Sequence, residues 1–368
     1  MTSMQLRRDD VIVGVDTHKD QHVAVLLDGL GGRLAELFIP ATLAGFTQLL
    51  AFCLARVGPD GQMVSFGVEG TGSYGIGLAR FLRRHGHTVH EVHRPPRKGE
   101  RRMSGKSDTI DAEHAARQVL SGVQMARPKT ADGAIEALRL IKIARDTAVK
   151  ARTTAMITLK ATLVTADDDL RTELEPLTDF KLVAACAELP SASSPTDPGA
   201  AMRHVLGSLA RRWLTLHEEI KIHSRHLKVQ TKAAAPQLVE AVGIGLDIAA
   251  EMLVTAGDNS DRIRSEAAFA KMCGACPIPA GSGKTNGRHR LNRGGNRQAN
   301  AALYRAVIVR MRWHEPTIAY VTRRTAEGLS KREIIRCLKR YLAREIYHLL
   351  PPIEATATPG ATPRKLVA

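Results

Sequence analysis

The chain has 368 residues, room for roughly two or three folding units, and its 44% hydrophobic and 4% aromatic content favours Ala-, Val-, Leu- and Ile-rich helices and α/β layers. Its 53 basic and 37 acidic residues give a net charge of +16, which indicates nucleic acid as partner rather than a membrane, because no Trp- or Phe-rich amphipathic helix is evident. The sequence has no long apolar run and no secretory signal, and its five cysteines are too few and too scattered for a disulfide framework. We therefore expect a cytoplasmic, nucleoid-associated protein with reduced thiols.

Short strands and helices alternate in the first part of the chain. The apolar runs at 11–16 and 22–28, separated by a polar stretch, predict a β-hairpin, and MVSFGVE at 63–69 predicts a third strand. Residues 75–86 predict a helix that ends at its last glycine, and HTVHEV predicts a fourth strand. This alternation predicts an α/β domain over residues 1–128.

The pattern then changes to helices. Residues 129–235 are rich in Ala, Leu, Lys and Arg and are interrupted at 189–199, which predicts a helical or coiled-coil hairpin that links the domains and mediates oligomerisation. In residues 236–350 a Gly-x-Gly turn separates two short apolar helices; this is similar to a helix-hairpin-helix, with an ordinary glycine turn as an equal alternative. A basic amphipathic helix is predicted at 330–350, and the tail at 351–368 is expected to be disordered.

Positive charge is concentrated near the C-terminus. Residues 262–346 contain 19 Lys and Arg against 5 Asp and Glu, a net charge of +14. The rest of the chain is therefore close to neutral. An even surface charge that served only solubility would not be distributed in this way, so the C-terminal region is the expected nucleic-acid-binding part.

Four acidic residues lie where strands end or a helix begins. Asp16 and Glu69 each end an apolar strand, and the carboxyl ends of strands line the functional edge of an α/β sheet. Ser107 is a plausible N-cap that places Asp108 and Asp111 three residues apart on one helical face. Four acids repel one another unless cations lie between them, and carboxylate oxygens suit Mg²⁺ or Mn²⁺. Such ions stabilise the attacking and leaving oxygens in phosphoryl transfer.

Each acid also has an ordinary interpretation, as a turn former, a solvated strand end or a first-turn acid that the helix dipole favours. The basic loop directly before the acidic pair shifts the balance toward function, because it would hold a phosphate backbone beside the metals. Its cations are Arg94, Arg97, Lys98, Arg101, Arg102 and Lys106.

A second chemical motif is the loop of small residues around Ser282, which can wrap a phosphate. Its basic residues are Lys284, Arg288, Arg290, Arg293 and Arg297. A serine needs activation by a metal, by a base such as His289, or by arginines that stabilise the departing charge; the alternative is a serine that only bonds its own backbone. SGKT lacks the first glycine of a P-loop, and the single pair Cys273 and Cys276 favours buried packing over zinc.

These blocks resemble a known family. VGVDTHKDQHVAVLLD, GVEGTGSYG and KSDTIDAEHAAR are similar, in order and spacing, to the Asp-Glu-Asp-Asp, RuvC-like domain of insertion-sequence 110 family transposases. FAKMCGACPIPAGSGKTNGRHRLNRGGNRQANAALYRAV and the helix IIRCLKRYLAREIY resemble that family's second domain, the serine transposase domain.

The resemblance implies an RNase H-like fold, metal ligation by Asp16, Glu69, Asp108 and Asp111, and a nucleophilic role for Ser282. Many relatives carry two adjacent serines, whereas here Gly281 precedes Ser282, which leaves one candidate. The resemblance also implies guidance by a structured non-coding RNA. The basic regions would then hold RNA as well as DNA, although no residue pattern here discriminates the two.

We therefore expect a metal-dependent DNA transposase that cuts and rejoins donor and target DNA through a covalent phosphoserine intermediate. Because long helices separate the acidic and serine domains, we expect one composite site formed across protomers of a homo-oligomer, a dimer or a tetramer. Two alternatives stay open. One is a RuvC-type junction-resolving nuclease in which water attacks and Ser282 is structural, and the other is a non-catalytic nucleic-acid-binding protein.

Overall fold

The computed structural model describes residues 7–92, 107–122, 126–190, 196–283, 289–292 and 294–350. The chain divides into two compact units. The first consists of the residues up to Gly133 together with Gly257–Arg264, and the second of Ala134–Ala256 with 265–350. The finer boundaries expected from the sequence stay a prediction. Within the described residues no helix is long and apolar enough to cross a membrane.

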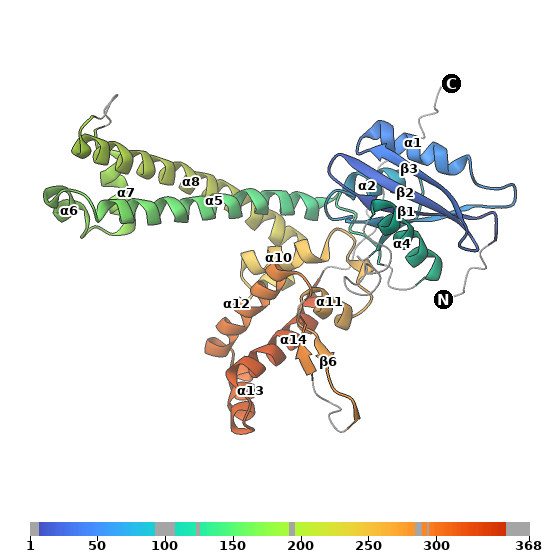
Figure 1. Cartoon of the computed structure of the whole chain (residues 1–368). Helices are drawn as coiled ribbons and strands as arrows, with labels where there is room; N and C mark the ends of the chain where they lie inside the picture. The colour runs from blue at the N-terminus through green and yellow to red at the C-terminus, as the bar shows by residue number, and fades with distance from the viewer. Residues whose placement is uncertain are drawn as a thin grey trace. The chain divides into compact units, whose positions relative to one another are not determined.

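A five-stranded sheet of order β3-β2-β1-β4-β5 is the centre of the first unit (Figure 1). Antiparallel pairing joins β1 to β2 and β2 to β3, and parallel pairing joins β1 to β4 and β4 to β5. The strands are β1 Val11–Thr17, β2 Gln21–Asp28, β3 Arg33–Pro40, β4 Met63–Glu69 and β5 Val89–Val92. The mixed sheet with helices on its faces is the RNase H-like arrangement that we expected.

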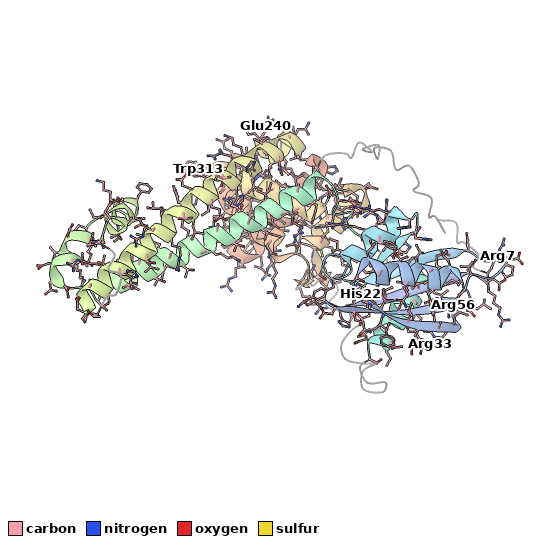
Figure 2. All side chains as sticks on the ribbon, turned by 90° about the horizontal axis from the view of Figure 1, so that it is seen from above. Arg7, His22, Arg33, Arg56, Glu240 and Trp313 are labelled. Atoms are coloured by element: carbon pink, nitrogen blue, oxygen red, sulfur yellow. The ribbon has the colours of Figure 1, made fainter. Side chains whose placement is uncertain are left out.

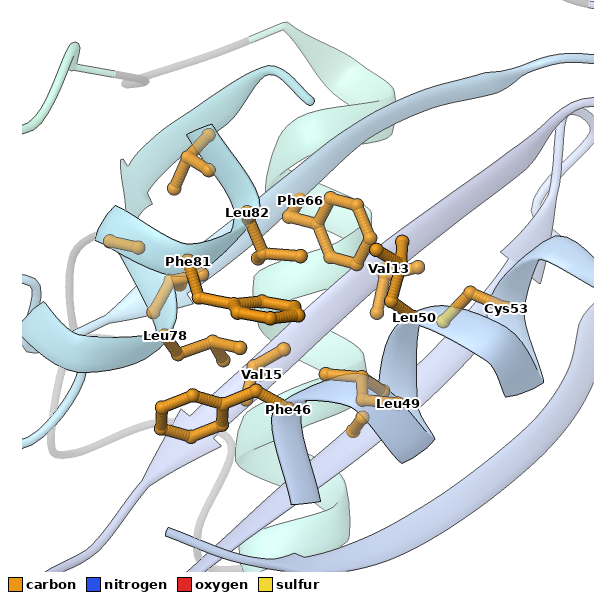
Figure 3. Close-up of a cluster of buried hydrophobic side chains, with 14 of the residues drawn as sticks. Val13, Val15, Phe46, Leu49, Leu50, Cys53, Phe66, Leu78, Phe81 and Leu82 are labelled. Carbon is orange, nitrogen blue, oxygen red and sulfur yellow. The ribbon is translucent and has the colours of Figure 1, made fainter. Parts of the chain in front are cut away.

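Side chains of β1 alternate between the two faces of the sheet, because successive residues of a strand point in opposite directions. Val13 and Val15 pack against α1 (Leu43–Leu54) and α2 (Ile76–Arg84) in the core shown in Figure 3. Ile12, on the other face, belongs to a separate cluster with Ala112, Ala115, Ala116 and Val119 of α4 (Asp108–Ser121). The sheet is therefore covered on both sides.

The predicted hairpin, the helix that ends before Gly86 and the two later strands are confirmed, but the strand at 63–69 is the fourth along the chain and not the third. Sequence analysis missed α1 and β3. The missed strand lies at the edge of the sheet, where Arg33 and Glu36 are exposed, so it lacks the apolar run of a central strand. Arg33 and Arg56, which follows α1, both lie at the surface of the unit (Figure 2).

Two long helices dominate the first part of the second unit. α5 (Ala134–Leu163) and α8 (Pro198–Ala234) run side by side (Figure 1), as the predicted helical hairpin requires. At one end the short helices α6 (Asp168–Leu174) and α7 (Asp179–Ala187) complete a core that includes Leu159, Leu206 and Trp213.

The rest of the second unit is mostly helical. Gly243, with φ +77°, forms the predicted turn between α9 (Pro236–Glu240) and α10 (Leu246–Ala256). The predicted basic helix is α14 (Lys331–Leu349), and its Ser330 N-cap forms a capping box with Glu333. The remaining elements here are α11 Glu266–Met272, β6 Pro277–Pro279, β7 His289–Leu291, α12 Arg297–Trp313, α13 Glu315–Ala326 and α14 Lys331–Leu349. The tail predicted to be disordered, 351–368, lies outside the described residues.

A candidate metal centre and a serine loop

Asp16 and Glu69 lie at the same end of two neighbouring parallel strands. Val15 of β1 pairs with Val68 of β4, and each acid is the next residue of its strand. The Thr17 hydroxyl donates a hydrogen bond of 2.8 Å to the Glu69 carbonyl oxygen and so joins the two strand ends. Asp16 is 6% exposed and Glu69 is 9% exposed, so both carboxylates are largely removed from water.

Helix α4 brings the other two acids against this sheet. Gly14 of β1 and Gly67 of β4 are paired across the strands, and both face the helix. A Cβ atom at Gly14 would clash with the backbone of Ala112, and one at Gly67 would lie 2.8 Å from the Ala115 carbonyl oxygen. The absence of side chains at both glycines is what permits this close approach.

The N-terminus of α4 then presents Asp108 and Asp111 in its first turn. Ser107 is the N-cap, as predicted, and its hydroxyl accepts a hydrogen bond of 3.2 Å from the Thr109 amide. Both acids are partly exposed. Because the cap fixes where the helix begins, it also fixes which residues occupy the turn that faces the strand ends.

Asp16 interacts with all three other acids. Burial raises the pKa of Asp16 above its ordinary value, His18 opposes this shift, and Glu69, Asp111 and Asp108 raise the pKa further. The Nε2 atom of His18 lies 3.2 Å from Asp16 Oδ2 and 3.4 Å from Asp108 Oδ1. The imidazole therefore lies between two carboxylates, in a place that suits a cation.

Asp16, His18 and Asp108 form the one group of His, Cys, Asp and Glu side chains, within the described part of the chain, whose ligand atoms converge closely enough to hold a metal ion. Carboxylate oxygens with one imidazole nitrogen are a donor set that Mn²⁺ accepts, and the carboxylates alone suit Mg²⁺. Sequence analysis missed His18. The available signal was its position in the polar turn directly after the strand that ends with the acid.

Ser282 lies in the second unit, in the loop between β6 and β7. These short strands pair antiparallel, with Ile278 opposite Arg290 and Pro279 opposite His289. Ser282, His289 and Arg290 are exposed, as is Arg297 at the start of α12. Lys284, Arg288 and Arg293 lie outside the described residues, and so does the whole basic loop that contains Arg94, Arg97, Lys98, Arg101, Arg102 and Lys106.

Cys273 is buried, as the expectation of packing requires, and zinc binding by Cys273 and Cys276 stays untested. All five are free thiols. Cys273 is fully buried, and burial raises the pKa of its thiol to about 12. Cys276 accepts a hydrogen bond of 3.3 Å from the Asn292 side-chain amide.

Comparison with known proteins identifies the same two regions. Residues 13–166 match a family model for the DEDD transposase of IS110, and residues 235–322 match one for the Transposase IS116/IS110/IS902 family. Together these matches cover about two thirds of the chain.

Two relatives come from insertion elements. The 43.6 kDa protein of IS110 from Streptomyces coelicolor is 26% identical over 148 residues, which is 40% of this chain but only 36% of the relative. The 44.8 kDa protein of IS116 from Streptomyces clavuligerus is 24% identical over 408 residues, which covers 96% of this chain and 100% of the relative. With a DEDD domain at its N-terminus and the second family domain toward its C-terminus, the chain belongs to the IS110 family of transposases, which are DNA-cutting enzymes.

Proposed function

We propose that this transposase cuts and rejoins DNA with Mg²⁺ or Mn²⁺ held by Asp16, Glu69, Asp108 and Asp111, and with Ser282 as the nucleophile. The observation that carries the metal site is geometric: ligand atoms of Asp16, His18 and Asp108 lie within 4.8 Å of one another. Glu69 and Asp111 fall outside that group, and what supports them as further ligands is their position, at the end of the neighbouring strand and in the first turn of α4. Four carboxylates at one edge of a sheet repel one another, and a divalent cation relieves that repulsion. When bound, such a cation polarises the scissile phosphate.

The supporting observation for the serine is its exposed position in a hairpin loop of a strongly basic region. In the proposed step a bond forms between Ser282 Oγ and phosphorus while the bond from phosphorus to the oxygen of the leaving strand breaks. The hydroxyl proton passes to a base, for which His289 on β7 is the candidate, and the leaving oxygen takes up a proton. The phosphoserine conserves the phosphodiester energy, so a free hydroxyl of another strand can attack it and release the serine.

We extend the proposal to the partners. The net charge of +14 between residues 262 and 346, of which all but Arg262 and Arg264 lie in the second unit, supports binding of donor and target DNA and of a structured guide RNA. Exposed apolar side chains along α5 and α8, among them Ile157 at 64% and Val229 at 69% exposure, support a homo-oligomer assembled through these helices.

The serine is tested by trapping the intermediate. A nicked substrate that loses its leaving strand after attack should leave a protein band shifted by the mass of the attached oligonucleotide, dependent on divalent metal. Ser282→Ala should abolish both the adduct and cleavage, whereas Thr285→Ala, which removes a neighbouring hydroxyl, should retain both.

Undiminished cleavage by Ser282→Ala would overturn this reaction and favour a hydrolytic, RuvC-type nuclease. Binding that never changes strand connectivity, with or without metal, would favour the non-catalytic alternative. An adduct mapped to another residue would move the nucleophile.

A further inference from the structure

A pocket of about 600 Å³ lies in the second unit, between the first turns of α12 and one face of α14. Four basic side chains line it, and no described residue of its lining is acidic. These cations are Arg297, Arg332, Arg336 and Lys339. The three from α14 are spaced by four and three residues, which places them in one stripe on that helix.

Lys339 is the most buried of these cations, at 9% exposure. Its Nζ donates a hydrogen bond of 2.9 Å to the Asn300 side-chain oxygen. The Asn300 amide nitrogen in turn donates to the carbonyl oxygens of Cys273 and Gly274, at 2.9 and 3.0 Å, so its oxygen is fixed toward the lysine. Burial lowers the pKa of Lys339, and Arg336 lowers it further. Two cations therefore share one pocket wall and repel each other.

Within the described residues, no carboxylate forms an ion pair with any of the four pocket cations. A contrast lies between the same two helices, where the buried Arg310 of α12 donates two hydrogen bonds of 2.6 Å to Glu345 of α14. Glu333, one turn before Arg336, instead accepts hydrogen bonds from the amide and hydroxyl of Ser330. Glu333 and Arg336 still attract each other, since Arg336 adds to the lowering of the pKa of Glu333 by the Ser330 hydrogen bonds. Lys339 is buried without an ion-pair partner among the described residues, which is costly, so this wall favours an anion from outside the chain.

An aromatic side chain completes the pocket. Tyr304 lies two turns after Arg297 on α12, lines the same pocket and is 48% exposed. Aromatic rings beside cations are how proteins hold single-stranded nucleic acid, with the base stacked on the ring and the phosphate on the charges. The pocket volume also lies in the range of small-ligand sites and exceeds what a bare phosphate needs.

We propose that this pocket binds one unpaired nucleotide of a DNA or RNA strand, with its phosphate against Lys339, Arg336 and Arg332 and its base against Tyr304. A base inside a duplex is stacked on both faces, so only an unpaired or extruded nucleotide reaches the tyrosine. The inference rests on the nucleic-acid binding proposed above. It requires neither the metal centre nor Ser282.

The test measures binding of fluorescently labelled oligothymidylate of about 12 nucleotides to the full chain by anisotropy, in EDTA and at constant salt. Arg332→Gln with Arg336→Gln should weaken binding about ten-fold or more, because it removes two of the three proposed phosphate contacts. The matched control is Arg312→Gln with Arg323→Gln, which removes the same charge from exposed residues outside the pocket lining and should cost less than about three-fold.

Duplex binding and the aromatic ring provide the second readout. Both double variants should lose affinity equally for the same strand paired with oligoadenylate. Tyr304→Ala should weaken single-strand binding about ten-fold, whereas Trp313→Ala should not, since Trp313 is 78% exposed at the end of α12 (Figure 2) and outside the pocket lining. A matched oligouridylate separates the sources: tighter binding of RNA assigns the pocket to the guide, and tighter binding of DNA assigns it to the substrate.

The proposal would be overturned if the two double variants lost equal affinity for the single strand, or if Tyr304→Ala kept full affinity for it. Asp16→Asn and Ser282→Ala should both keep wild-type affinity for the oligothymidylate. If both variants also kept wild-type cleavage, the proposed reaction would be wrong, whereas the proposed nucleotide pocket would be unaffected.

Discussion

At Asp16, burial and three neighbouring acids favour the neutral carboxyl, and His18 opposes them. Removing this charge by Asp16→Asn should lower cleavage by about a hundred-fold or more, since a lost charged ligand removes several kcal/mol of transition-state stabilisation. Without metal the same change should raise Tm by roughly 2–4 °C, because it relieves like-charge repulsion in a buried site. Cleavage assays and melting curves in EDTA and in Mg²⁺ measure both effects.

Asp20→Asn is the matched control, because Asp20 is an exposed acid in the turn that follows β1. Asp20→Asn should keep the wild-type cleavage rate, the wild-type Tm and the stabilisation by metal. Wild-type protein should melt higher in Mg²⁺ than in EDTA, because a ligand that binds the folded state stabilises it. Recombination by Asp16→Asn at the wild-type rate would show that the metal lies elsewhere.

The four acids were predictable individually because each has a local signature, a strand end or a capped helical turn. His18 was not, because its contacts with Asp16 and Asp108 depend on how the turn after β1 meets the start of α4, which are far apart in sequence. Asn300 and Lys339 were missed for the same reason: an asparagine and a lysine in separate helices carry no pattern that reveals their hydrogen bond.

At the scale of elements, the seating of α4 on the sheet decides where Asp108 and Asp111 lie. Gly14→Ala should force the helix away from β1, since the added methyl would clash with the Ala112 and Ala116 backbone. We expect a loss of about 1–3 kcal/mol in unfolding free energy, the usual cost of overpacking, and a larger loss of cleavage than stability alone explains. Urea titration and a cleavage assay test this at a temperature where the variant is folded.

Gly77→Ala tests whether the effect belongs to this contact. Gly77 lies within α2 of the same unit, and a Cβ there would meet Phe46 at an ordinary distance of 3.4 Å. This substitution should be neutral or slightly stabilising, because alanine favours a helix interior. Equal behaviour of the two variants would mean that close packing of α4 does not position the acids.

Elements whose apolar residues recur at a regular spacing were predicted correctly. Segments whose position depends on contacts with distant parts of the chain were not. β1, β2, α5, α8 and α14 each carry their own pattern of apolar residues. The segment Gly257–Arg264 does not: it follows α10 in sequence yet packs with the first unit. There the Asn259 side chain donates to the Pro128 carbonyl oxygen at 2.9 Å and accepts from the Thr130 amide at 3.1 Å. No local sequence pattern predicts that this segment packs with the first unit.

At the scale of the whole molecule, the acids belong to one unit and Ser282 to the other. The composite site across protomers stays a prediction, and subunit mixing tests it. Asp16→Asn and Ser282→Ala each inactivate one half of the proposed chemistry, and they leave the other half intact. Because Asp16→Asn replaces one oxygen by an amide nitrogen and Ser282→Ala removes one hydroxyl, neither should impair assembly.

In a symmetric dimer with sites shared across the interface, a mixed dimer contains one site with both defects and one site with neither. Random mixing makes half of the dimers mixed, so the mixture should recover about a quarter of wild-type cleavage, whereas each variant alone stays inactive. If each site were built within one protomer, every site in the mixture would carry a defect and activity would stay at background. Tagged variants, denatured together, refolded and assayed for cleavage and for the phosphoserine adduct, separate these cases, since the adduct should form only on the protomer that carries Asp16→Asn.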